Sequence, residues 1–265
     1  MNFTKAILLT ALIAALQLVI IIPIYFILGV EDFGTDSFQH FVGFTGIVAY
    51  FISFWFVLVL IGKLKVTWRF GVERFKSLKL ENIIYLFLIG LGLRFFIRPF
   101  FDLVEILPSL NEIGKPYQHH QKSSLTLVYE SISILVLPPI LEELFFRKYL
   151  ISRLSQKYSL SIAILISSIC FMLIHLPHYS NLIPTLILGV VCALVYIHTR
   201  NIISSIILHF FYNLVWFVLQ IYGENYYRWI SELNFDIMYW VVFLFGIMLI
   251  TLGLKKLNTA NKELS

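Results

Sequence analysis

A long apolar run near the start of the chain reads AILLTALIAALQLVIIIPIYFIL from Ala6 to Leu28. It contains no charged residue, and a helix needs about 20 such residues to cross the roughly 30 Å hydrocarbon core of a bilayer. The run is also longer than the apolar region of about 7–15 residues in a secretory signal peptide, so we expect it to be retained. This stretch therefore predicts a first membrane-spanning helix.

Comparable apolar runs recur along the rest of the chain. Lipid admits only helices or closed barrels, and these runs are too long and too continuous for the alternating strands of a barrel. The predicted fold class is therefore an all-α membrane protein, a polytopic bundle of about eight transmembrane helices. The further runs cover approximately residues 41–62, 82–98, 123–146, 159–176, 181–198, 202–220 and 236–254.

The composition agrees with a lipid environment. Of the 265 residues, 59% are hydrophobic and only 13% are charged, whereas a soluble domain has about 25% charged residues. A chain so poor in charge could not cover a water-exposed surface. This excludes an ordinary cytosolic enzyme, a disordered chain and a nucleic-acid partner, and it makes the lipid bilayer the expected partner.

The loop charges predict an orientation. The connection 29–40 carries three acidic residues and no Lys or Arg, whereas the connection 63–81 carries six basic residues. By the positive-inside rule the second connection is cytoplasmic, and both termini are then cytoplasmic as well. The short connections suggest a multi-pass protein of the bacterial plasma membrane.

Two neighbouring glutamates stand out in the fourth run, which reads LVLPPILEELFFRKYL from Leu135 to Leu150. Glu142 and Glu143 follow a Pro-Pro pair that removes two backbone donors and should kink the helix. A charge inside a bilayer costs about 2.5–3.5 kcal/mol on insertion scales, so such residues often mark function. The alternative is a helix end whose charges lie at the headgroup level.

The two glutamates, Glu142 and Glu143, are predicted to have different surroundings. Arg147 follows Glu143 by one helical turn, the orientation that favours an ion pair. Glu142 points about 100° away around the helix and has no local partner. A carboxylate in apolar surroundings suits a general base.

Two later runs carry polar residues with their own alternatives. The fifth run ends CFMLIHLPHYS, with His175 at the end of an apolar helix, where a lone His is often merely interfacial. The seventh reads IISSIILHFFYNLVW, in which His209 and Asn213 share one helix face. A hydrogen bond between helices would explain one such residue, but two on one face favour a functional role.

These residues form the inventory of a hydrolase that lacks a nucleophilic side chain. A carboxylate and a His can activate water, and a second His with an Asn can donate hydrogen bonds to an oxyanion. The same set could bind a divalent metal such as zinc that carries the water, with Glu142, His175 and His209 as candidate ligands. The spacing is not that of a HExxH zinc helix.

Three motifs in this order resemble those of a known family. Residues Glu142–Arg147 fit EExxxR, Phe171–His175 fit FxxxH, and His209–Asn213 fit HxxxN. Together they resemble the CPBP intramembrane proteases, also called the Abi family. This family includes the Rce1-type CAAX prenyl endopeptidases and the bacteriocin-processing and self-immunity proteins. The resemblance covers about residues 123–220.

The resemblance implies a role for each residue. Glu142 and His175 would activate the attacking water, while His209 and Asn213 would stabilise the tetrahedral oxyanion. The Glu143–Arg147 pair would orient the site. The family is commonly named metalloprotease, but a metal-free mechanism that depends on glutamate is also proposed for it, and both remain open here.

The expected function is therefore an intramembrane endopeptidase. It would hydrolyse a peptide bond in a membrane-associated protein or peptide, lipidated or not, in CAAX-type processing or in the processing of a bacteriocin or other peptide precursor. The alternative is a non-enzymatic membrane protein that gives bacteriocin self-immunity or regulates a partner by binding.

The resemblance also divides the chain. We expect three N-terminal transmembrane helices with their loops in residues 1–122, the protease core in 123–220, and a final loop and helix in 221–265. One tension is that simple topology places Glu142 near the cytoplasmic face but places His175 toward the far end of its helix. Outside the motifs, Arg94 and Arg98 precede Asp102 at four-residue spacing, which is typical of an ion-paired interfacial face.

Overall fold

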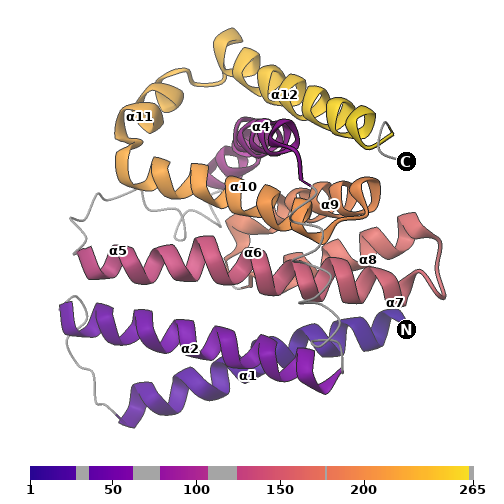
Figure 1. The fold of residues 1–265 in the computed structure, drawn as a ribbon. Coiled ribbons are helices and arrows are strands. Elements are labelled where there is room, and N and C mark those ends of the chain that lie inside the picture. Colours follow the sequence, from indigo (N-terminus) through magenta and orange to yellow (C-terminus); the bar gives the residue numbers. More distant parts are fainter. Residues whose placement is uncertain (28–35, 62–77, 107–123, 177, 263–265) are drawn as a thin grey trace. The chain divides into compact units, whose positions relative to one another are not determined.

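The computed structural model describes residues 1–27, 36–61, 78–106, 124–176 and 178–262. Within these ranges the chain is almost entirely helical and contains no strand. The acidic residues Glu31 and Asp32 and the connection 62–77, which carry most of the orientation argument, lie outside the described residues. The helices are α1 (Phe3–Ile27), α2 (Asp36–Leu60), α4 (Leu80–Ile106), α5 (Ser124–Ser131), η1 (Ile132–Val136), α6 (Leu137–Glu142), η2 (Glu143–Ile151), α7 (Ser152–Leu154), α8 (Leu160–Leu173), η3 (Tyr179–Asn181), α9 (Leu182–Thr199), α10 (Ile202–Tyr222), α11 (Glu224–Glu232) and α12 (Ile237–Lys262) (Figure 1).

Seven helical stretches of the described chain are long and apolar enough to cross a membrane. They coincide with the apolar runs of the sequence, and they confirm an all-α, multi-pass membrane protein. One run is shorter than predicted. Helix α8 has 14 residues, or about 21 Å at 1.5 Å per residue, which does not span a core of about 30 Å. The chain therefore has seven full-length candidates and one short apolar helix among the described residues.

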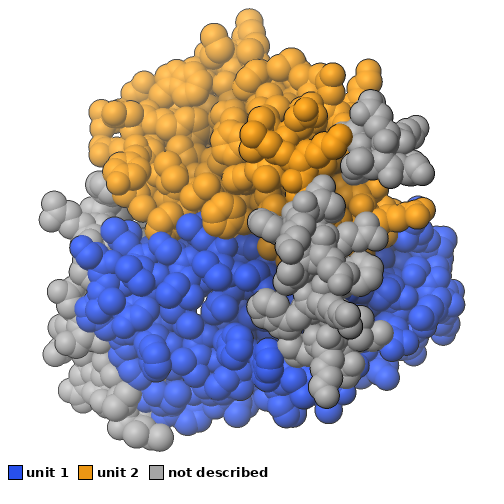
Figure 2. Space-filling view, in the orientation of Figure 1, with its two compact units in different colours: residues 1–71, 120–174 blue, residues 72–119, 175–265 orange. Residues whose placement is uncertain are grey.

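The chain divides into two compact units, which Figure 2 shows in different colours. Unit 1 comprises Met1–Gly71 and His120–Ile174, and unit 2 comprises Val72–His119 and His175–Ser265. Each unit thus joins two separate stretches of the chain. The sequence-based division at residues 122 and 220 remains a prediction.

Unit 1 is built around the long helical stretch Ser124–Leu154. Helix α2 packs against α1 on one side and against α5 and α6 on the other, and α8 packs against η2 (Figure 1). The N-terminus is held to the same unit, because the α-amino group of Met1 donates a hydrogen bond to the carbonyl of Arg153 at 3.0 Å. The glutamates therefore lie on a helix that has neighbours on several sides.

The Pro-Pro pair changes the hydrogen-bond pattern of this stretch without ending it. Pro138 and Pro139 stand in the first turn of α6, where missing backbone donors are tolerated. The N–H of Leu137 bonds to the carbonyl of Ile132, five residues back, which is the π-helical pattern. A second π-helical segment, η2, follows directly and begins at Glu143. Such π segments often occur at functional sites.

Unit 2 is built around α4, which packs against α9, α10 and α12 (Figure 1). The approach of α4 to α12 is close at two glycines. A Cβ added at Gly92 would lie 2.8 Å from the carbonyl oxygen of Gly246, and one added at Gly246 would lie 2.7 Å from that of Gly92. Small residues allow membrane helices to pack at such short range.

Candidate functional site

The three polar residues of the first motif are buried in unit 1. Glu142 ends α6, Glu143 begins η2, and Arg147 lies one turn further on. Their exposed fractions are 3%, 0% and 1%. Headgroup-level residues would remain in contact with water or lipid headgroups, so this burial argues against the interfacial alternative for all three.

Glu143 and Arg147 form the predicted ion pair. The Nε of Arg147 lies 3.1 Å from Oε2 of Glu143. The guanidinium also lies over the Phe171 ring, 4.2 Å from its centroid, and 5.9 Å from that of Phe146. A buried charge is tolerated when it is paired and has further favourable contacts. The motif residue Phe171 therefore has a structural role, as a platform for Arg147.

Glu142 has a partner that the sequence did not predict. The hydroxyl of Tyr50 on α2 donates a hydrogen bond to Oε1 of Glu142 at 2.5 Å. The sequence prediction concerned only partners on the same helix, whereas Tyr50 lies 92 positions earlier in the chain. The weak signal in the sequence was a phenol within the apolar run 41–62.

Aromatic and polar contacts hold this arrangement in place. The Tyr50 ring packs on Phe54 with centroids 4.9 Å apart, and Phe54 meets Phe145 edge-on at 6.2 Å. Ser167 on α8 donates a hydrogen bond to the carbonyl of Phe146 at 2.7 Å. A hydrogen bond therefore joins the backbone of η2 to α8, and the ring of Phe145, also in η2, packs against α2.

His175 begins the described part of unit 2 after α8. The sequence placed it at the end of its helix, but α8 ends at Leu173 and His175 lies in the turn that follows. Its carbonyl accepts a hydrogen bond from the N–H of His178 at 3.0 Å, which closes the turn. His175 is half-buried and His178 is exposed. Pro177, two residues after His175 in the sequence, lies outside the described residues.

His209 and Asn213 lie one turn apart on α10, as the spacing predicted. His209 is 2% exposed and Asn213 is half-buried. One turn earlier, the hydroxyl of Ser205 donates a hydrogen bond to the carbonyl of Cys192 on α9 at 3.0 Å. This contact fixes α10 against α9 close to the motif.

The polar residues thus form two sets, one in each unit. Unit 1 supplies buried carboxylates that can accept a proton. It also supplies a phenol and a guanidinium that can orient these carboxylates. Unit 2 supplies an imidazole and an amide on one helix face, which can donate hydrogen bonds to a developing oxyanion, and a second imidazole in the turn after α8.

Among the residues that the structure describes, neither unit by itself offers a set of ligands suited to a metal. Within the described ranges, no group of three or more His, Cys, Asp or Glu side chains is arranged to hold an ion. In unit 1 one of the two carboxylates is already paired with Arg147, and a nearby guanidinium disfavours a cation. The metal candidates Glu142, His175 and His209 remain predictions.

The range that matches a known protein family includes the polar residues of both units. The family described as Type II CAAX prenyl endopeptidase Rce1-like matches residues 124–215, a range that contains all seven motif residues. The UPF0177 protein YxdF of Lactococcus lactis subsp. lactis (strain IL1403) is 30% identical over 164 residues, which are 59% of this chain and 89% of that protein. No solved structure matches the chain.

Proposed function

This chain belongs to the CPBP (Abi) family, which includes the Rce1-like CAAX prenyl endopeptidases, and on that premise we propose that it is an intramembrane endopeptidase. The family match supports peptidase activity in a multi-pass membrane protein. The observation that carries the proposal is the burial of Glu142, Glu143 and Arg147 within a membrane-spanning stretch. Charged groups at such a place are costly and are retained chiefly for function.

In this proposal Glu142 and His175 activate the attacking water. The water oxygen bonds to the carbonyl carbon of the scissile peptide while one proton passes to the Glu142 carboxylate. The carbon–nitrogen bond then breaks, and the departing amine takes that proton. The hydrogen bond from Tyr50 supports this role, because it holds one carboxylate oxygen in place.

His209 and Asn213 are proposed to stabilise the oxyanion that forms during the attack. Both side chains can donate hydrogen bonds, and their common helix face would present the two donors to one oxygen atom. The packing of α10 on α9, with the hydrogen bond from Ser205 to the Cys192 carbonyl, supports this role, because preorganised donors stabilise a transition state most effectively.

Glu143 and Arg147 are proposed as positioning residues. The 3.1 Å ion pair lies at the π-helical start of η2, directly after Glu142. A fixed pair at this place would set the direction of the preceding carboxylate. Its role is tested by whether stability and activity can be separated in variants of the pair.

The substrate class that we propose is a membrane-associated protein or peptide, cut near its C-terminus in the manner of CAAX processing. A bacteriocin or another peptide precursor is the second substrate type that the assay includes. Both can be presented as internally quenched peptides in proteoliposomes, with and without a prenyl group.

The deciding experiment compares purified wild type with Glu142→Gln. We expect cleavage by the wild type and a loss of at least about 100-fold in the variant, because removal of a general base costs about 10²–10⁴-fold. Glu81→Gln is the matched control, since the same change at an exposed residue of α4 should have no effect. Equal cleavage by wild type and Glu142→Gln would refute the proposal.

A chelator arm addresses the metal. Activity that is lost with a chelator and restored by zinc supports the metal-dependent mechanism. Activity that a chelator leaves unchanged supports direct activation of water by Glu142. If the wild type cleaves no peptide yet binds one with Glu142 intact or replaced, the non-enzymatic alternative is favoured.

A further inference from the structure

Helix α4 carries three charged residues on one face at four-residue spacing, Arg94, Arg98 and Asp102. All three lie within the candidate membrane span Leu80–Asp102. Two positive charges and one negative charge leave a local excess of one positive charge. A charged residue inside a membrane span usually pairs with another group or marks a functional site.

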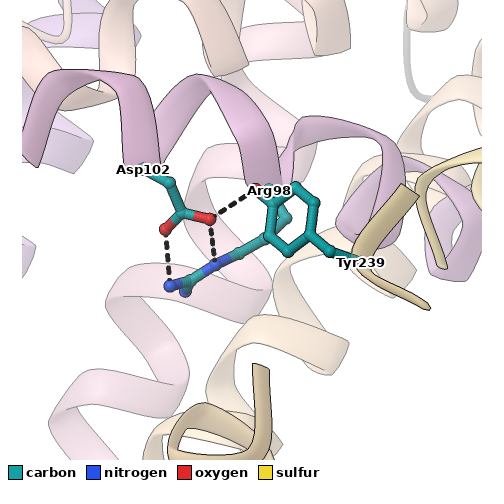
Figure 3. A network of polar contacts seen from close by, with 3 residues as sticks. All are labelled: Arg98, Asp102 and Tyr239. Carbon is teal, nitrogen blue, oxygen red and sulfur yellow. Dashed lines mark hydrogen bonds and ion pairs between the residues drawn. The ribbon is translucent and has the colours of Figure 1, made fainter. Parts of the chain in front are cut away.

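Asp102 is engaged by Arg98 (Figure 3). Nη2 and Nε of Arg98 lie 2.6 Å and 3.0 Å from the two carboxylate oxygens of Asp102. The hydroxyl of Tyr239 on α12 donates a further hydrogen bond to Oδ2 at 2.5 Å. Bidentate pairing of this kind fixes both groups. The negative charge of Asp102 therefore compensates the positive charge of Arg98.

Arg94 lacks such a partner in the described part of the chain. It forms neither an ion pair nor a hydrogen bond with any described residue, and its guanidinium lies over the Tyr212 ring, 5.0 Å from the centroid. Nearby on α11, burial raises the pKa of Tyr226, an effect that Arg98 and Arg94 partly oppose. Tyr226 is thus a neutral phenol at neutral pH and supplies no negative charge.

The position of Arg94 connects it to the second polar set of unit 2. Tyr212 is 7% exposed and stands between His209 and Asn213 in the sequence of α10. Helix α4 packs directly against α10. A guanidinium held on this ring is therefore placed beside the helix that carries the proposed oxyanion donors.

We propose that Arg94 binds the C-terminal carboxylate of the peptide substrate. The planar fork of a guanidinium matches a carboxylate with two hydrogen bonds. A CAAX sequence stands at the extreme C-terminus of its protein, so the three residues beyond its cysteine end in a free carboxylate. Extended, they span about 10 Å, so the terminal carboxylate would be bound apart from the scissile bond. This assignment rests on the proposed function and adds a specificity-determining residue to it.

The test uses an internally quenched peptide that ends in Cys-aliphatic-aliphatic-Met, as the free acid or as the C-terminal amide. The wild type should cleave the acid with a kcat/KM about 10-fold or more above that of the amide, the scale of one charge-assisted hydrogen bond. Arg94→Gln should lower this ratio to about one by slowing cleavage of the acid alone. Arg94→Lys should restore part of the preference, because it keeps the charge but not the fork.

If Arg94→Gln changes kcat/KM by the same factor for the acid and for the amide, the assignment is overturned. Effects that follow the content of phosphatidylglycerol in the liposomes, whatever the peptide terminus, would instead assign Arg94 to a lipid headgroup. Thermal unfolding in detergent shows whether the variant folds like the wild type.

A binding measurement separates this proposal from the proposed function. Fluorescence anisotropy compares the labelled acid and amide on Glu142→Gln and on Glu142→Gln/Arg94→Gln, neither of which needs to cleave. Preference for the acid that disappears with Arg94 supports the assignment even if no cleavage is found. Equal binding of both peptides to both variants refutes it, whereas failure of the proposed function appears as equal cleavage by wild type and Glu142→Gln.

Discussion

At the scale of single residues, two adjacent glutamates differ in their partners. Glu143 is paired with Arg147 on the next turn, and Glu142 accepts a hydrogen bond from Tyr50 on another helix. The first carboxylate therefore has its negative charge compensated by a cation. The second accepts a hydrogen bond from a neutral phenol, which orients the carboxylate in the way that a general base requires.

Arg147→Met tests the buried ion pair. The variant should lose about 3–5 kcal/mol of stability, because it removes the cation that compensates a buried carboxylate. The double variant Glu143→Leu/Arg147→Met should recover most of that stability but no peptidase activity. Thermal unfolding and peptide cleavage of the same samples provide the measurements. A single variant as stable as the wild type would show that the pair does not matter for folding.

Tyr50→Phe tests the contact that orients Glu142. Loss of a hydrogen bond to a charged group costs about 1.5–3 kcal/mol, so we expect kcat to fall about 10-fold or more while KM changes little. Tyr222→Phe removes the same hydroxyl from a side chain that is 80% exposed and serves as the control. Unchanged kcat in Tyr50→Phe would mean that the hydrogen bond does not support catalysis.

The sequence could predict one of these two contacts and not the other. The pairing of Glu143 with Arg147 follows from helical periodicity alone, and the structure confirms it. The contact of Glu142 with Tyr50 joins residues 92 positions apart. It depends on how α2 packs against α6, which no local spacing encodes.

At the scale of helices, apolar length was a good guide to where crossings occur and a poorer guide to where they end. The fifth run was expected over residues 159–176, but α8 covers only Leu160–Leu173. Its last described turn, Ile174–Leu176, contains His175, so a polar residue follows the helix instead of ending it. The helix that contains the Pro-Pro pair likewise lies between two π-helical segments, which hydropathy cannot predict.

Gly246→Leu tests the close packing of α4 on α12. A side chain there would begin 2.7 Å from a backbone oxygen and from a backbone nitrogen, neither of which can move aside like a flexible side chain. We expect the melting temperature to fall by several degrees, since overpacking typically costs about 1–3 kcal/mol.

Gly46→Ala is the matched control for this substitution. No atom lies within 4 Å of a Cβ added at Gly46, which is also inside a helix. This change should be neutral or slightly stabilising, because alanine favours a helix over glycine. Equal melting temperatures for Gly246→Leu and the wild type would contradict the close packing of the two helices.

At the scale of the whole molecule, two units each combine an early and a late stretch of the chain. The motifs could be recognised from the sequence because each spans only five or six consecutive residues. The division into units could not, since it depends on contacts between distant helices such as α4 with α12 or α1 with α8. The polar residues of the motifs are distributed over both units.

The predicted orientation is also a property of the whole chain. Single cysteines introduced at Lys63 and at Glu31, in a background without Cys170 and Cys192, should label differently in intact cells. A reagent that cannot cross the membrane should reach position 31 and not position 63, and a C-terminal green fluorescent protein fusion should fluoresce. Labelling of position 63 from outside would reverse the topology with both termini cytoplasmic.

We propose that Glu142 and His209 take part in one hydrolytic reaction. A double-mutant cycle of kcat/KM for Glu142→Gln and His209→Ala tests it most directly, because groups that act as a unit show strongly non-additive effects. We predict that each single variant loses most of the activity and that the double variant loses little more. Losses that simply multiply, or a Glu142→Gln variant as active as the wild type, would contradict the claim.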